Sequence, residues 1–170
     1  MKRALYPGRF QPFHKGHLHA VEYILKEFDE IIIAIMAAQY NFTFENPFTA
    51  GERIWMIREC LKNYIDRIII VPILNIENNY PWISNLKSFV PPFDIIFSNH
   101  PLIKILCEKE NFPVREIPFL KREEYVGKRI REMMAEGKDF EEFLPPKIVE
   151  IIKKINGIER IKKLREKEEG

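Results

Sequence analysis

The chain has 170 residues, the length of one domain, and 46% of them are hydrophobic, which is enough for a packed core and excludes a disordered chain. Lys and Arg total 27 against 25 Asp and Glu, and this net charge of +2 argues against nucleic acid as a partner. No apolar run approaches the roughly 20 residues of a membrane span, and Cys60 and Cys107 form no CxxC pair, so we expect a cytoplasmic protein without a membrane partner.

Five short apolar segments predict β-strands. Residues 29–35, 67–72 and 93–97 are apolar without alternation, which is typical of strands buried on both faces, and residues 4–6 and 114–117 are weaker candidates. Helical patterns separate them, over residues 17–28, 50–64, 81–89, 101–111 and 128–136. Strands that alternate with helices imply right-handed βαβ crossovers, so we expect an α/β fold with a Rossmann-like, doubly wound, five-stranded parallel sheet.

The helix predicted over residues 50–64 has the clearest start. Thr49 is its candidate N-cap, and Glu52, three residues later, completes a capping box. An apolar stripe at helical spacing follows, made of Ile54, Ile57, Leu61 and Tyr64. The connection before this helix, residues 37–49 (the long loop), is longer than such connections usually are. Loops of this length are often functional.

The pattern is only helical from residue 138 onward. The prolines at 145 and 146 would open a helix that runs to residue 155, and Gly157 would end it before a short basic helix. We expect a single domain over residues 1–170, in which the α/β core ends at residue 137 and residues 138–170 add C-terminal helices.

The first predicted strand runs into residues 8–17, GRFQPFHKGH, named the HxGH segment below. Ligands of parallel sheets bind beyond the carboxyl ends of the strands, so this segment lies where a nucleotide would bind. Gly8 and Gly16 allow the backbone to approach a ligand closely. The helix that starts at this point supplies unpaired N–H groups and a positive dipole end, which together favour an anion.

Four cationic or donor side chains surround that helix start: Arg9, His14, Lys15 and His17. Histidines three residues apart lie on one face of the first turn, so the cluster predicts a polyphosphate site. Two alternatives stay open for the histidine pair, a metal site and ordinary surface histidines, although the usual helical metal spacing is HxxxH. His19 and His100 are interpreted as structural, and His100, after the fourth strand, could approach the nucleotide.

An HxGH pattern after a first strand resembles the signature of the nucleotidylyltransferase superfamily, and the whole HxGH segment resembles the archaeal-type nicotinamide mononucleotide (NMN) adenylyltransferases. Four further segments are similar to that family: residues 46–53 (NPFTAGER), 79–82 (NYPW), 90–94 (VPPFD) and 155–160 (INGIER). The resemblance covers nearly the whole chain.

The resemblance implies an enzyme of NAD biosynthesis that transfers AMP from ATP to NMN and forms NAD and pyrophosphate. The NMN phosphate would attack the α-phosphorus in line without a covalent enzyme intermediate, so catalysis would consist of positioning and charge stabilisation. The resemblance also implies Mg²⁺ carried with ATP, no metal site built from protein ligands, and a homo-oligomer, commonly a hexamer.

Residue roles follow from the same resemblance. The implied catalytic residues are Arg9, His14, His17 and Arg131. The implied ATP-binding residues are Gly8, Arg9, Phe10, His14, Gly16, His17, Lys128, Ile130 and Arg131. On the NMN side, Trp82 would stack on the nicotinamide ring, and the other implied contacts are Gln39, Asn75 and Asn79. The alternative for Trp82 is a core aromatic, and that for the region around Lys128 is a solvated basic helix end.

Two parts of the chain depart from the family pattern. Val126 and Lys128 stand where hydroxyl residues usually stand, and Lys128 could replace them as a point charge. On the substrate side, the replacements are Ala37 for Ser, Phe42 for His and Asn75 for the common Asp. These departures leave two alternatives open: an adenylyltransferase of the same fold that acts on another phosphorylated acceptor, and a nucleotide sensor with weakened catalysis.

Overall fold

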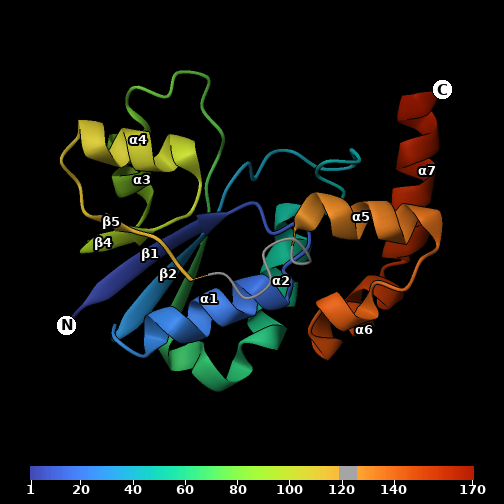
Figure 1. The fold of residues 1–170 in the computed structure, drawn as a ribbon, viewed down its shortest axis with the longest axis horizontal. Helices are drawn as coiled ribbons and strands as arrows, with labels where there is room; N and C mark the ends of the chain where they lie inside the picture. Colours follow the sequence, from blue (N-terminus) through green and yellow to red (C-terminus); the bar gives the residue numbers. More distant parts are fainter. Residues whose placement is uncertain (119–125) are drawn as a thin grey trace.

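The computed structural model describes residues 1–118 and 126–170 and has a central parallel sheet (Figure 1). The strand order is β3-β2-β1-β4-β5, and every adjacent pair is parallel, which confirms the predicted sheet. The strands are β1 (Arg3–Gly8), β2 (Glu30–Ile35), β3 (Ile68–Pro72), β4 (Ile95–Phe97) and β5 (Val114–Arg115). The chain moves outward from β1 to β3 and then returns to β4, so the topological switch point lies between β1 and β4.

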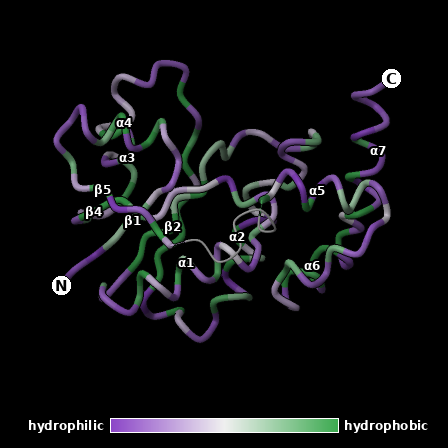
Figure 2. Tube along the Cα trace, viewed as in Figure 1, coloured by the Kyte–Doolittle hydropathy of each residue, from purple (hydrophilic) through white to green (hydrophobic). Residues whose placement is uncertain are grey.

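Successive residues of a strand point to opposite sides of the sheet, and apolar residues on both sides pack against helices. In β2, Ile31, Ile33 and Ile35 belong to one core cluster, and Ile32 and Ala34 belong to the other. Figure 2 shows β2 as mostly hydrophobic and α7 as mostly hydrophilic. The first cluster packs under α1 (Lys15–Leu25), α2 (Ala50–Cys60), α5 (Gly127–Glu136) and α6 (Pro146–Lys154), and the second under α3 (Trp82–Phe89) and α4 (Pro101–Lys109).

The predicted helices exist, but several of their bounds were wrong. The first helix begins at Lys15 rather than His17, because His14 caps it earlier than the apolar pattern suggested. It ends at Leu25. The helix predicted to reach Tyr64 ends at Cys60, where Leu61 leaves the helical region, and a 3-10 helix (Lys62–Arg67) turns the chain into β3. The buried face of α2 consists of Arg53, Met56 and Ile57, which includes a charged residue that the predicted stripe omitted.

The C-terminal part contains a short 3-10 helix (Glu141–Phe143), α6 and α7 (Gly157–Glu169). Gly157 was predicted to end a helix, and this was wrong, because Asn156 takes the left-handed conformation (φ 54°) and Gly157 opens α7. A Cβ atom on Gly157 would lie 2.9 Å from Cγ2 of Ile152 and 3.1 Å from Cε1 of Phe48, so close packing requires the glycine. None of the helices in the described residues is long and apolar enough to span a membrane.

Candidate active site

His14 and His17 build the start of α1. The ring Nδ1 of His14 accepts hydrogen bonds from the backbone N–H groups of Gly16 (3.1 Å) and His17 (3.3 Å). The ring Nδ1 of His17 in turn accepts from the backbone N–H of His14 (3.0 Å). Two imidazoles thus form the capping box that Ser and Glu usually form. Since both Nδ1 atoms are acceptors, a neutral ring at either position carries its proton on Nε2.

The two imidazole rings are stacked, with centroids 3.6 Å apart and an interplanar angle of 20°. Below them, Phe10 and Phe13 contact the ring of His17, at 4.8 and 5.4 Å between centroids. Burial lowers the pKa of His14 to about 3. Burial and the neighbouring His14 lower the pKa of His17 well below its ordinary value. Both rings are therefore uncharged near neutral pH and act as hydrogen-bond donors rather than as fixed charges.

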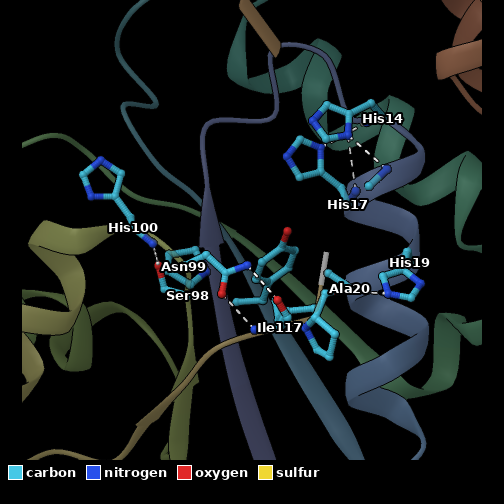
Figure 3. Close-up of a pocket in the computed structure, with 12 residues that line it drawn as sticks. His14, His17, His19, Ala20, Ser98, Asn99, His100 and Ile117 are labelled. Atoms are coloured by element: carbon cyan, nitrogen blue, oxygen red, sulfur yellow. Dashed lines mark hydrogen bonds between the residues drawn. The ribbon is translucent and has the colours of Figure 1, made fainter. Parts of the chain in front are cut away.

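A pocket of about 200 Å³ opens beside the histidine pair at the switch point between β1 and β4 (Figure 3). Ligand pockets usually have roughly 300–1,000 Å³, so this one suits a part of a nucleotide. In Figure 3, the stacked rings lie on one side and His100 on the other. The lining comes from the ends of β1, β4 and β5 and from α1: Tyr6, Pro7, His14, Gly16, His17, His19, Ala20, Ser98, Asn99, His100, Ile117 and Pro118.

The far wall of the pocket is fixed by hydrogen bonds between β4 and β5. The amide of Asn99 donates to the carbonyl of Ile117 and accepts from its N–H, both at 2.8 Å. His100 caps α4, because its Nδ1 accepts from the N–H of Leu102 (3.2 Å). The ring Nε2 of His19 lies 3.1 Å from the carbonyl of Pro118. The histidines at 19 and 100 therefore have structural contacts, as interpreted from the sequence, and also line the pocket.

Three guanidinium groups, those of Arg9, Arg53 and Arg131, lie in or near the HxGH segment but do not line this pocket. Arg131 is buried, and its Nη1 donates to the carbonyl of Gln11 (2.9 Å), while its Nε has no hydrogen-bond partner among the described residues. Burial and, less strongly, the charge of Arg9 lower the pKa of both Arg53 and Arg131 to about 10. Such a concentration of positive charge favours an anion, and Glu45 offsets it in part beside Arg131.

Arg53 joins the HxGH segment to the long loop, and it was not among the predicted site residues. The residue is fully buried and donates to three carbonyl groups at the two strand ends: Arg9 (2.9 Å), Met36 (3.0 Å) and Ala37 (3.3 Å). Gln11 forms a second bridge, because its amide exchanges two hydrogen bonds with the backbone of Phe48 (2.9 and 3.0 Å). A charged residue in the NPFTAGER segment was the signal that could have identified Arg53.

The predicted NMN residues lie beyond the ends of β2 and β3. The side chain of Gln39 donates to the carbonyl of Asn75 (3.0 Å) and accepts from its N–H (2.8 Å), so the long loop and the segment after β3 are paired. Asn79 is exposed in the same segment. Trp82 begins α3, half-buried against the second core cluster, which leaves part of the indole accessible.

Several predicted ATP-binding residues are placed differently from the histidines. Phe10 (φ 53°) and Ile130 have buried side chains in the first core cluster, so only their backbones could approach a ligand. A Cβ atom on Gly8 would lie 2.8 Å from the ring of Phe10, which explains this glycine by packing. Arg9 and Lys128 are exposed, and neither they nor Arg131 line the pocket beside the histidine pair.

The sequence of the chain is similar to those of known proteins. A family model described as cytidylyltransferase-like matches residues 5–154. A nicotinamide-nucleotide adenylyltransferase of Pyrobaculum arsenaticum is 48% identical over 95% of this chain and 93% of its own length, and one of Thermoplasma acidophilum is 46% identical over 96% and 92%.

A solved structure supports the fold alone. It is a bifunctional NMN adenylyltransferase/ADP ribose pyrophosphatase of Francisella tularensis, with a TM-score of 0.75 at 19% identity. The match covers 96% of this chain and 51% of that chain, so this chain spans about half the length of the Francisella protein.

Proposed function

The chain belongs to the nicotinamide-nucleotide adenylyltransferases of the cytidylyltransferase-like family, and from this premise we propose how it works: it transfers AMP from ATP to NMN and releases NAD and pyrophosphate. One observation supports the chemistry most strongly. The imidazoles of His14 and His17 are stacked at a helix N-terminus, with both Nδ1 atoms occupied, beside a pocket at the carboxyl edge of the sheet.

In the proposed reaction, the base and ribose of ATP occupy the pocket between the histidine pair and β4. An oxygen of the NMN phosphate attacks the α-phosphorus, the bond to the β-phosphate breaks, and pyrophosphate leaves with the electron pair. The Nε2–H groups of His14 and His17 donate to the oxygens on which charge increases in the transition state. Arg9, Arg131 and Lys128 bind the β- and γ-phosphates on the other side of the HxGH segment.

NMN binds at the ends of β2 and β3 in this proposal. Trp82 would stack on the cationic nicotinamide ring, and Asn79 would orient the NMN end. The paired Gln39 and Asn75 would form the base of this site, because their mutual hydrogen bonds hold the two loops together. Asn75 carries no charge, so it contributes hydrogen bonds rather than an ion pair.

Mg²⁺ fits this site as an ion carried by ATP. Residues 1–118 and 126–170 contain no group of three or more His, Cys, Asp or Glu side chains that could hold a metal ion. The residues around the HxGH segment are mainly cationic, whereas Mg²⁺ prefers oxygen ligands, so phosphate oxygens would hold it. When bound, the ion would offset the negative charge of the triphosphate.

The proposed function is tested by turnover. Purified protein with ATP, Mg²⁺ and NMN should form NAD and pyrophosphate in equal amounts, measured by chromatography and by a phosphate assay after pyrophosphatase treatment. A panel of other phosphorylated acceptors, including the deamidated mononucleotide, forms the comparison. Turnover of another acceptor without turnover of NMN would favour the same fold with a different substrate. ATP binding without turnover of any acceptor would favour a nucleotide sensor.

The oligomeric state is a separate proposal. We propose a homo-oligomer, a hexamer by resemblance to the family. Sedimentation equilibrium at several protein concentrations tests this directly, and a monomer at all concentrations would contradict it.

A further inference from the structure

The long loop is strained, and its middle, residues 39–45, is mostly exposed, so contacts from outside the loop must hold its shape. Ala37 (φ 53°) and Phe42 (φ 52°) both take the left-handed conformation, which side chains with a Cβ atom rarely adopt. Such residues cost of order 1–3 kcal/mol each and persist where the surrounding structure fixes them. Arg53 binds the carbonyl of Ala37 from the core, but Phe42 is 51% exposed and has no such support from the sheet.

The support for Phe42 comes from the C-terminal helix. In Figure 1, the loop after β2 runs away from the sheet toward the side of the molecule where α5 and α7 lie. Arg160 of α7 lies over the ring of Phe42, with 4.4 Å between its guanidinium carbon and the ring centroid. The same guanidinium donates to the carbonyl of Pro47 (3.1 Å) and to both carboxylate oxygens of Glu52 (2.7 and 2.9 Å). One side chain thus contacts the middle of the long loop, its end and the first turn of α2.

The Arg160–Glu52 pair is mostly buried, with 16% and 19% of the two side chains exposed. Burial alone would raise the pKa of Glu52, but hydrogen bonds from Arg160 and Thr49 hold it below its ordinary value. Glu52 also completes the capping box of α2 by accepting from the N–H of Thr49 (2.9 Å). Bidentate geometry and partial burial make this ion pair stronger than an ordinary surface pair.

A second contact lies about two turns later on the same helix. The carboxylate of Glu168 accepts a hydrogen bond from the backbone N–H of Phe44 (2.7 Å). The guanidinium of Arg165 lies 5.9 Å from the ring centroid of Phe44. Glu168 also borders a hollow of about 470 Å³ with Gln39 and Tyr40, which places the end of α7 beside a predicted NMN residue. Helix α7 therefore contacts the long loop at Phe42, Phe44 and Pro47.

From these contacts, we propose that Arg160 and Glu168 are positioning residues, through which α7 holds the long loop in the conformation that the second substrate requires. The inference rests on the proposed function, because that function assigns the long loop to the NMN side of the site. Within the described residues, no hydrogen bond or ring contact joins Arg160 or Glu168 to the HxGH segment. Loss of either contact should therefore affect the second substrate and leave ATP binding unchanged.

The direct test measures the loop itself. In Glu168→Ala, the amide proton of Phe44 loses its acceptor and should exchange with solvent about tenfold faster, measured by NMR hydrogen exchange on the full chain. Glu166→Ala is the matched control, because it removes the same charge from an exposed position of the same helix. Equal exchange of the Phe44 amide in wild type and Glu168→Ala would overturn the proposal.

The kinetic test measures the consequence. Arg160→Ala and Glu168→Ala should each raise the KM for NMN about tenfold and change the KM for ATP less than twofold. Arg160→Lys should recover only part of the loss, because an ammonium cannot form the bidentate pair, and Lys162→Ala serves as the charge control. Equal increases in both KM values, or no increase in either, would contradict positioning of the acceptor side.

Failure of this inference can be distinguished from failure of the proposed function. Wild-type protein that turns over NMN, combined with variants that keep its KM, refutes the inference and leaves the function intact. Wild-type protein without NMN turnover refutes the function, and the exchange rate of the Phe44 amide still decides whether α7 holds the loop, since that measurement needs no substrate.

Discussion

The HxGH segment and the long loop leave adjacent strands side by side, and they are held in opposite ways. In the HxGH segment, His14 and His17 bond to each other within four residues and rest on a buried aromatic floor. The long loop is held by residues that lie outside it, by Arg53 from α2 and by Arg160 and Glu168 from α7. The first arrangement is local and rigid, whereas the second depends on distant parts of the chain.

This difference matches what the proposed reaction would require of the ATP side and the acceptor side of the site. Charge that develops during phosphoryl transfer is stabilised best by donors fixed before the reaction, and a capping box provides that fixation. The acceptor side must admit a nucleotide and release a dinucleotide, which an exposed loop with peripheral supports allows. The two sides can therefore be changed independently, except through Arg53 and Gln11, which bridge them.

The largest effect is expected from removal of a donor on the rigid side. His17→Ala should lower kcat about 10²–10³-fold, since one preorganised donor contributes about that much to transition-state stabilisation. Loss of its bond to the His14 N–H should cost only about 1 kcal/mol of unfolding free energy. Initial rates with saturating ATP and NMN, together with thermal melts, test both. A near-normal kcat would refute the role of the imidazole.

The next largest effect is expected from substitution of Arg53, because this residue contacts both regions. Arg53→Met leaves the carbonyl groups of Arg9, Met36 and Ala37 without their donor and should lower the unfolding free energy by about 3 kcal/mol. Urea denaturation measures this loss. The KM values for both substrates should also rise. A rise for only one substrate would mean that Arg53 does not couple the two regions.

A smaller effect concerns pH and only the rigid side. His14 has a folded pKa of about 3, below its unfolded value, so its contribution to stability is complete above about pH 6.5 and is lost as the pH falls toward 3. Between pH 6.5 and 5, this amounts to about 1.5 kcal/mol. In His14→Asn, which keeps a capping oxygen, the unfolding free energy should depend less on pH over this window. An unchanged pH dependence would show that the ring is not neutral when folded.

The smallest effect belongs to the acceptor side alone. Trp82→Ala should raise the KM for NMN about fivefold and leave the KM for ATP unchanged, because stacking of a cationic ring on an indole contributes about 1 kcal/mol. Steady-state kinetics with each substrate varied in turn test this. An unchanged KM for NMN, accompanied by a lower melting temperature, would identify Trp82 as a core residue only.

The sequence predicted most of the fold and the proximity of His14 and His17, because both depend on short-range signals. Apolar runs marked the strands, and the spacing of His14 and His17 placed both rings on one turn. The contacts of Arg53 and Arg160 could not be predicted, since their partners lie up to 113 residues away. A buried arginine and a surface arginine look the same in a sequence, because the folded chain decides which carbonyl groups each one meets.

The neutral state of the histidine pair has a consequence for how the protein responds to acidity. A phosphate beside an imidazole favours its protonated form, so the complex with ATP should hold protons more tightly than the free protein. By thermodynamic reciprocity, ATP should then bind more tightly as the solution becomes more acidic. Because the pKa of His14 in the free protein is about 3, the calorimetric binding heat of ATP should vary with the ionisation enthalpy of the buffer only in acidic solution. The rings that begin α1 would thereby couple nucleotide affinity to proton uptake.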